Sequence, residues 1–323
     1  MWLVLFVTAA VTEAAKCRAI ALAGGGSYGA YEVGAFKGLV HSLSADDIAY
    51  NVATGISAGS LNAAALAEYA MGSEVEASDF LVGVWENLQG EGSIFREWPG
   101  GYLTGLLVES GMLNTQPLNE LLHYYVSSIE RNVTVGATNL NDGSYAIFDE
   151  TDGEDGLVQG AMASSAIPVV FQTQKFGGEV WVDGGVTYGN DIGGAVTRCL
   201  DVTGGKQEDI IVDMVSCGSP HLASQTKDLN SINAFTRQND IQSYTSSMDQ
   251  LFWAMDAFPD VFFRYYVEPR QGLPGSSALD FGHDVIMKTI DIGYDDAKYY
   301  VANNIYASDV LAAWRQRPDI VYV

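Results

Sequence analysis

Ser57 lies in the run Gly-Ile-Ser-Ala-Gly at positions 55–59, which fits the pattern Gly-x-Ser-x-Gly. A short apolar stretch, 50–54, precedes this run, and an alanine-rich stretch, 61–70, follows it. A serine on a sharp turn between a strand and a helix exposes its hydroxyl as a nucleophile, and Gly55 and Gly59 permit that turn because they carry no Cβ. The pattern predicts a nucleophile elbow and acyl-transfer chemistry at Ser57.

A glycine-rich run, Gly-Gly-Gly-Ser-Tyr-Gly at positions 24–29, lies upstream between an apolar stretch, 18–23, and an apolar-faced stretch, 30–40. Its glycines are Gly24, Gly25, Gly26 and Gly29. Backbone N–H groups that converge at a helix N-terminus suit a phosphate or the oxyanion of a tetrahedral intermediate. The run fits G-x-G-x-x-G, but the position about twenty residues on falls in a loop, and no Gly-Lys-Ser/Thr follows. An oxyanion hole is therefore favoured over a nucleotide site.

Asp183 ends the apolar stretch 180–182 and is followed by Gly184 and Gly185, which form the only Asp-Gly-Gly sequence in the chain. Most Asp-Gly pairs form turns. An aspartate at the end of a buried strand, after a hairpin at 177–178, is instead placed for catalysis. Burial would raise its pKa toward the range in which a carboxylate accepts a serine proton.

These runs, together with Ala-Ser-Ser-Ala-Ile-Pro-Val-Val-Phe at 163–171, resemble the patatin-like phospholipases in order and spacing. The resemblance covers most of residues 17–220. It implies an α/β fold, a three-layer α/β/α sandwich around a central, mainly parallel or mixed sheet. It also implies a Ser-Asp catalytic dyad rather than a triad.

Carried over to this chain, the resemblance implies Ser57 as nucleophile, Asp183 as base and the amides of Gly24, Gly25 and Gly26 as the oxyanion hole. The supporting glycines would be Gly29, Gly55, Gly59, Gly184 and Gly185. Tyr28 stands where the family usually has Arg or Lys. A phenol cannot supply that positive charge, so any electrostatic help from this position is lost.

Three other interpretations stay open. The four histidines are His41, His123, His221 and His283, and none lies in a catalytic motif. Ser57, Asp183 and then His221 or His283 would nevertheless reproduce the chain order of α/β-hydrolase esterases, although the nucleophile lies unusually near the N-terminus. A non-catalytic storage or lipid-binding protein on the same fold is the second alternative, and a nucleotide-binding enzyme is the third.

The composition and net charge of the chain limit the kinds of molecule that it can bind. The chain has 323 residues, is 48% hydrophobic and carries a net charge of −24, which argues against nucleic acid and against docking by charge on anionic bilayers. The resemblance implies a lipid substrate (phospholipid, lysophospholipid or galactolipid), and with this charge we expect transient contact with a membrane surface through apolar side chains. The segment 90–111 reads as an irregular apolar flap, and the aromatic-rich segment 229–266 as mostly core.

The ends of the chain and its cysteines complete the expectations. Residues 1–15 resemble a secretory signal peptide and are too short to span a membrane. They predict a secreted or endomembrane-lumen protein, or a cytoplasmic one if the segment is not cleaved, with a single patatin-like phospholipase domain over 16–323. Cys17, Cys199 and Cys217 allow at most one disulfide. We expect no metal and no cofactor, and a helical stretch, 294–315, that packs on the sheet.

Overall fold

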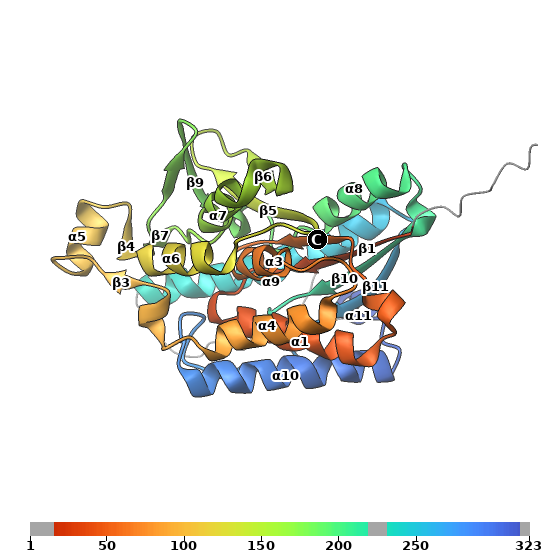
Figure 1. Cartoon of the computed structure of the whole chain (residues 1–323). Coiled ribbons are helices and arrows are strands. Elements are labelled where there is room, and N and C mark those ends of the chain that lie inside the picture. The colour runs from red at the N-terminus through yellow and green to blue at the C-terminus, as the bar shows by residue number, and fades with distance from the viewer. Residues whose placement is uncertain (1–15, 219–230, 317–323) are drawn as a thin grey trace, which may run out of the picture.

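A central sheet of eight strands organises the computed structural model, which describes residues 16–218 and 231–316 (Figure 1). Seven strands follow the order β11-β10-β1-β2-β5-β9-β8, and β6 pairs with β5. Their bounds are β1 Cys17–Leu22, β2 Val52–Gly55, β5 Asn132–Asn139, β6 Tyr145–Asp149, β8 Gln174–Phe176, β9 Glu179–Asp183, β10 Ile210–Val215 and β11 Phe262–Val267.

The sheet is mainly parallel. Strands β11, β10, β1, β2 and β5 run parallel to one another, whereas β6 and β9 run antiparallel to β5, and β8 runs antiparallel to β9. The parallel strands are buried almost throughout, as expected for a sheet covered on both faces. The predicted mixed, mainly parallel sheet is confirmed.

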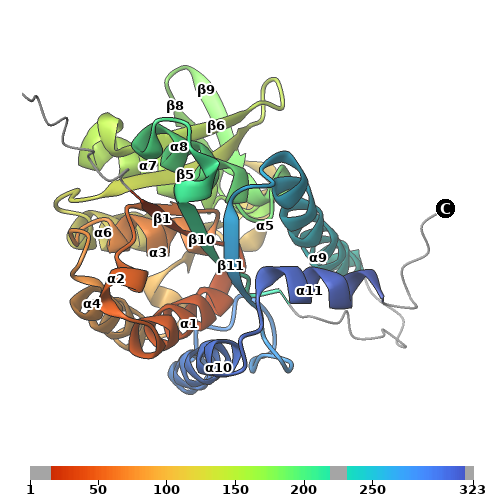
Figure 2. The same ribbon diagram turned by 90° about the vertical axis from the view of Figure 1, so that its right-hand side faces the viewer.

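Helices cover both faces of this sheet (Figure 2). One face carries α1 Gly29–Ser42, α3 Ala58–Leu66 and α4 Glu74–Glu86, and the opposite face carries α8 Ile192–Thr203. A further helix, α10 His283–Ala302, lies on the outer side of α1. The predicted α/β/α arrangement is therefore confirmed, with α10 as an addition outside it.

The C-terminal stretch differs from the expectation. It forms two helices, α10 and α11 Ala307–Arg315, and only α11 packs mainly on the sheet, against β11. The reason lies in α1, where a Cβ on Gly34 would stand 2.0 Å from the carbonyl oxygen of Ile290. The bare glycine lets α10 approach α1 closely, which hydropathy alone does not reveal.

The segment 90–111 is not irregular, so that prediction was wrong. It contains the short strand β3 and helix α5, and it leads into a second sheet of order β3-β4-β7. The elements outside the central sheet are β3 Arg96–Glu97, β4 Gly111–Asn114, β7 Val169–Phe171, α2 Ala45–Ile48, α5 Tyr102–Leu107, α6 Gln116–Tyr125, α7 Gly153–Ser164 and α9 Ser231–Ala257. Backbone pairing with residues far along the chain creates β3 and β7, and local pattern cannot predict it.

The aromatic-rich segment is core only in part. In β11, Phe263, Tyr265 and Tyr266 are buried, whereas Phe252 and Trp253 of α9 are half exposed. Across the described stretches 16–218 and 231–316, we find no helix with the length and hydropathy needed to cross a membrane.

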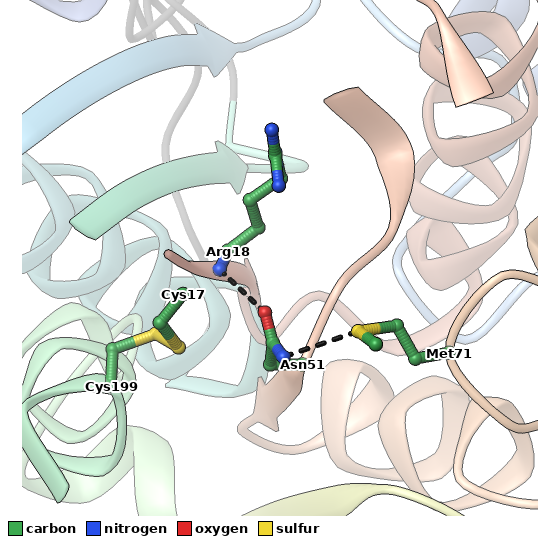
Figure 3. The surroundings of a disulfide bond; sticks show 5 residues. All are labelled: Cys17, Arg18, Asn51, Met71 and Cys199. Atoms are coloured by element: carbon green, nitrogen blue, oxygen red, sulfur yellow. Dashed lines mark hydrogen bonds between the residues drawn. A yellow bond between two sulfur atoms is a disulfide. The ribbon is translucent and has the colours of Figure 1, made fainter. Parts of the chain in front are cut away.

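A disulfide ties the start of the central sheet to the helix above it. Cys17 of β1 is bonded to Cys199 of α8, with 5.4 Å between their Cα atoms (Figure 3). Beside it, the Arg18 N–H donates to Asn51 Oδ1 at 2.9 Å, which joins β1 to the residue before β2. The third cysteine, Cys217, is free and buried. Of the possible pairs, the structure thus forms Cys17–Cys199.

Replacing both bridged cysteines, Cys17→Ser with Cys199→Ser, should lower the free energy of unfolding by about 3–5 kcal/mol, because the bridge closes a loop across 182 residues. Urea unfolding at neutral pH, followed by circular dichroism, measures this change. Reductant should lower the stability of the native chain similarly and leave the double variant unaffected. Equal midpoints for the two oxidised proteins would contradict a stabilising role.

Candidate active site

Ser57 occupies a strained turn between β2 and α3. Its backbone has φ 54° and ψ −123°, which is rare for a residue with a side chain and costs on the order of 1–3 kcal/mol. The flanking glycines make the turn possible. A Cβ on Gly55 would lie 2.1 Å from the Gly59 carbonyl oxygen, and one on Gly59 would lie 2.4 Å from that of Leu22. The sharp turn between strand and helix that the sequence predicted at Ser57 is therefore present.

Two serines hold this turn from outside the Gly-x-Ser-x-Gly run. The Ser57 N–H donates to Ser164 Oγ at 2.8 Å, and Ser60 Oγ donates to the Ser57 carbonyl at 2.6 Å. Ser164 is fully buried at the end of α7. Ser164 belongs to the run 163–171 that resembles the family, but no role was predicted for it from the sequence. The signal was a polar residue at the end of an apolar, alanine-rich helix.

Asp183 lies at the end of β9, opposite Ala137 of β5, and is buried. Its carboxylate accepts a hydrogen bond from the Gly185 N–H at 2.7 Å and shares a side-chain hydrogen bond with Ser57. Burial raises the pKa of Asp183 to about 6, although the bonds to Ser57 and Gly185 lower it somewhat. The structure therefore brings together the two side chains that the sequence singled out.

The glycine-rich loop passes directly beside the serine. A Cβ on Gly24 would stand 3.0 Å from Ser57 Cβ and 3.8 Å from Ser57 Oγ. The Gly24 N–H donates to the Gly189 carbonyl at 3.2 Å, whereas the N–H groups of Gly25 and Gly26 find no acceptor within the described part of the chain. Two of the three expected donors thus have no backbone acceptor among the described residues, and one of them, Gly26, lines the same pocket as Ser57.

The other predicted glycines stand where backbone segments meet. A Cβ on Gly184 would lie 2.2 Å from the Gly136 carbonyl oxygen, and one on Gly29 would lie 2.8 Å from Ala58 Cβ. A Cβ on Gly185 would lie 2.9 Å from an Asp183 carboxylate oxygen. These positions let the elbow, the loop and β9 approach one another.

An apolar pocket opens at the serine. Its empty volume is about 720 Å³ including the open mouth, within the range of small-ligand sites. Ser57 and Gly26 line it beside leucine, tryptophan and phenylalanine side chains, among them Leu81, Trp85, Leu118, Phe171 and Phe281. A serine hydroxyl beside apolar walls suits an ester with a hydrocarbon tail.

Comparison with known proteins identifies the family of the chain. The sequence model described as patatin-like phospholipase matches residues 20–196, which is more than half of the chain. The chain belongs to the patatin-like phospholipase family. Membership indicates a lipid acyl hydrolase acting on lipid substrates.

Among solved structures, the crystal structure of VipD from Legionella pneumophila is similar, with a TM-score of 0.42 and 14% sequence identity. The similarity covers 90% of this chain and 67% of that one. No curated protein sequence matches the chain.

A buried polar network supports the glycine loop of this patatin-like site. The thiol of Cys217, just after β10, donates to the Gly24 carbonyl at 3.3 Å and lies 3.7 Å from Glu32 Oε1. Asn62 Nδ2 donates to Glu32 Oε2 at 2.9 Å, and Trp85 Nε1 donates to Asn62 Oδ1 at 2.8 Å. The loop is thereby connected to α1, α3 and α4.

Sequence reasoning missed this network. Its only signal was a glutamate and an asparagine, Glu32 and Asn62, inside otherwise apolar helices. Burial raises the pKa of Glu32 well above its usual value, and burial together with the nearby Glu32 raises the pKa of the Cys217 thiol. A thiol held in its neutral form is a poor nucleophile.

The histidines lie elsewhere. His41, His123 and His283 are exposed; His41 Nδ1 contacts Tyr294 Oη at 3.1 Å, and His123 Nδ1 lies 3.8 Å from Asp155 Oδ1. His221 lies outside the described residues. Among residues 16–218 and 231–316, no group of three or more His, Cys, Asp or Glu side chains is arranged to hold a metal ion.

Proposed function

We propose that the chain is a serine lipid acyl hydrolase of the phospholipase A or lysophospholipase type, which cleaves carboxylic esters with a dyad of Ser57 and Asp183. The hydrogen bond between Ser57 and a buried carboxylate, at the wall of an apolar pocket, is the observation that carries this proposal. A buried carboxylate with a pKa of about 6 is a stronger base than a solvated one and is still ionised near neutral pH.

In the first half of the reaction, Ser57 Oγ attacks the ester carbonyl carbon as its proton passes to Asp183. The carbonyl oxygen gains a negative charge, which the Gly25 and Gly26 N–H groups stabilise. Because Gly24 already donates to Gly189, its part is to bring the loop against Ser57. The tetrahedral intermediate collapses, the alcohol leaves with the proton from Asp183, and the acyl group remains on Ser57.

In the second half, water attacks the acyl carbon while Asp183 accepts its proton. The same amides stabilise the second oxyanion. Collapse releases the fatty acid, and the proton on Asp183 returns to Ser57 Oγ. One carboxylate thus serves as base and acid in turn, so no imidazole is required.

The pocket sets the substrate class. Its leucine and aromatic lining suits the acyl chain, while the charged or sugar head group would remain toward the open mouth. Phospholipid, lysophospholipid and galactolipid all fit this description. With a net charge of −24, the protein is expected to reach neutral or zwitterionic lipid through brief apolar contact with a membrane surface.

A fluorophosphonate probe separates catalysis from mere lipid storage or binding. We expect the probe to label Ser57, identified by mass spectrometry, and not to label a Ser57→Ala variant. Ser165→Ala is the matched control, because Ser165 lines the same pocket but its hydroxyl donates to the Ala161 carbonyl at 2.9 Å. A protein with no labelling at Ser57 and no hydrolysis of lipids with matched acyl chains, with or without chelator, would be a binding protein.

The rate should depend on pH through Asp183. Since Asp183 must be ionised to accept the serine proton and its pKa is raised from 3.8 to about 6, kcat/KM should be constant above about pH 7. It should fall about tenfold per pH unit well below 6. Initial rates on a short-chain ester between pH 4 and 9 measure this profile.

A second buried carboxylate provides the control. Burial also raises the pKa of Asp191 to about 6, but this carboxylate accepts the Gly194 N–H at the start of α8. Asp191→Asn can keep that bond and should leave the midpoint of the profile unchanged. A midpoint near 4 in the native protein, or one that disappears in Asp191→Asn, would contradict the assignment to Asp183.

We also propose that the protein works in an oxidising compartment, either secreted or in the endomembrane lumen. The disulfide Cys17–Cys199 supports this, because such bonds persist mainly where thiols are not kept reduced. The predicted signal peptide lies outside the described residues. N-terminal sequencing of the mature protein would test its cleavage.

A further inference from the structure

Helix α5 and the residue after it expose an apolar surface at the edge of the molecule, beyond β3 and β4 (Figure 1). Leu103, Leu107 and Val108 are 71%, 81% and 76% exposed. Tyr102 and Leu106 are about half exposed. A contiguous group of large apolar side chains in water is unfavourable, so such surfaces usually mark an interaction site.

The packing of α5 against β4 holds this apolar surface toward the solvent. Gly105 is the buried residue of α5, and a Cβ there would lie 2.6 Å from the Gly111 carbonyl oxygen and 2.7 Å from that of Met112. The helix therefore rests on β4 through a glycine, which turns its leucines outward. Trp98 Nε1 donates to the Gly111 carbonyl at 3.0 Å and fixes the approach to the helix.

The charges on and around this surface indicate which kind of partner can bind it. Residues 98–108 carry no charged side chain in a chain whose net charge is −24, and Glu97 and Glu109 flank this stretch. A second copy of the chain would add another −24 charges, and anionic lipid would be repelled by the flanking carboxylates. A neutral or zwitterionic lipid surface would experience neither of these repulsions. Trp98 and Tyr102 also belong to the residue types that favour the interface between lipid and water.

The small sheet connects the backbone under α5 to the proposed acyl site. Strand β4, on which α5 rests, pairs with β7, so that Leu113 lies beside Phe171. Phe171 lines the pocket that opens at Ser57. An element held against this sheet would keep the pocket close to whatever α5 binds.

We propose that α5 and Val108 form the docking surface by which this protein settles on a zwitterionic or neutral lipid bilayer. This inference rests on the proposed function, which makes lipid the substrate of the adjoining pocket. The leucines enter the acyl region, Trp98 and Tyr102 lie at the level of the head groups, and the flanking glutamates stay in water.

Vesicle binding by the full chain carrying Ser57→Ala tests this without any turnover. Vesicles of diether phosphatidylcholine, which has no carboxylic ester bond, are sedimented with this protein and with the same chain carrying Leu103→Asp and Leu107→Asp. We expect the partition coefficient to fall about a hundredfold, because burial of each leucine contributes roughly tenfold or more. Replacing part of the phosphatidylcholine with phosphatidylglycerol should weaken binding, most strongly at low salt.

Leu140→Asp is the matched control, since Leu140 is 58% exposed at the turn between β5 and β6. It should bind vesicles as the unchanged protein does. The proposal is overturned if the unchanged protein does not bind, if the α5 variant binds equally well, or if Leu140→Asp weakens binding equally. It is also overturned if sedimentation equilibrium shows a dimer that the α5 variant dissociates, because a second copy would then cover α5.

A dye attached by way of Leu107→Cys gives an independent measurement if the aspartates disturb folding. An environment-sensitive fluorophore there should brighten on phosphatidylcholine vesicles, and the same dye at Leu140→Cys should not. Equal signals at both sites would overturn the proposal. Vesicle binding combined with no ester hydrolysis by the native chain would instead disprove the proposed enzyme and leave the docking surface standing.

Discussion

Ser57→Ala and Asp183→Asn should each reduce ester hydrolysis by roughly ten-thousandfold or more, and the double variant should be no worse than either single one. In the proposed mechanism both residues act in the same proton transfer, so removing one leaves the other without a function. Initial rates on a micellar phospholipid and on a soluble short-chain ester measure the losses. Circular dichroism and thermal unfolding establish that each variant is folded.

Stability gives Asp183→Asn a second, independent readout. The folded state holds the Asp183 proton more tightly than the unfolded state, because burial raises its pKa from 3.8 to about 6. The stabilisation from this group is complete below pH 3.8 and is lost as the pH rises through 6. Asparagine carries no charge to bury. Between pH 4 and pH 8, the free energy of unfolding of the variant should therefore rise relative to that of the native protein, by up to about 3 kcal/mol.

Histidine variants supply the contrasting outcome for the dyad. His221→Ala and His283→Ala should retain activity within about tenfold, since neither imidazole has a step to perform. A loss of roughly a thousandfold in a folded variant of either would establish a Ser-His-Asp triad of the α/β-hydrolase kind. Clear turnover by folded Ser57→Ala would remove the serine mechanism altogether.

Gly26→Ala should lower kcat about a hundredfold or more while changing KM by only a few-fold. Gly26 has φ +59°, and a Cβ there would lie 2.2 Å from the Ala278 carbonyl oxygen, so the loop must shift from its present position. Loss of one oxyanion donor alone corresponds to about a hundredfold to a thousandfold in kcat. Binding of the acyl chain depends on the apolar walls and should change little.

Gly143→Ala separates strain from catalysis. Gly143 also has a positive φ, +78°, but nothing lies within 4 Å of the added Cβ, and the residue sits in the turn before β6. It should destabilise the protein by about 1 kcal/mol and leave kcat unchanged. If Gly26→Ala behaved in the same way, the loop would not be the oxyanion hole.

The sequence predicted the parts of the site that depend on local chain geometry. A glycine pair around Ser57, three glycines before a helix and an aspartate at a strand end each mark a backbone turn, and such turns are encoded by neighbouring residues. The apolar stretches at 18–23 and 50–54 correspond to β1 and β2, because parallel strands covered on both faces are apolar on both sides.

What the sequence did not predict depends on contacts between distant segments. Ser164 supports Ser57 across 107 positions, and the Cys217 thiol reaches the Gly24 carbonyl across 193. The pairing of β7 with β4 and the packing of α10 on α1 have the same origin. No periodicity in a single segment records its remote partner, so these features required the folded chain.

Two contacts from the C-terminal part of the chain hold the glycine-rich loop in place. Ser27 donates its N–H to the Ala278 carbonyl at 2.7 Å, and the Cys217 thiol contacts Gly24, yet both supports lie beyond residue 196, where the family match ends. The family motifs therefore include the glycine-rich loop, whereas the residues that hold this loop in place come from a part of the chain outside the family match. We expect two relatives with identical motifs but different residues at these two supports to hold the glycine-rich loop differently.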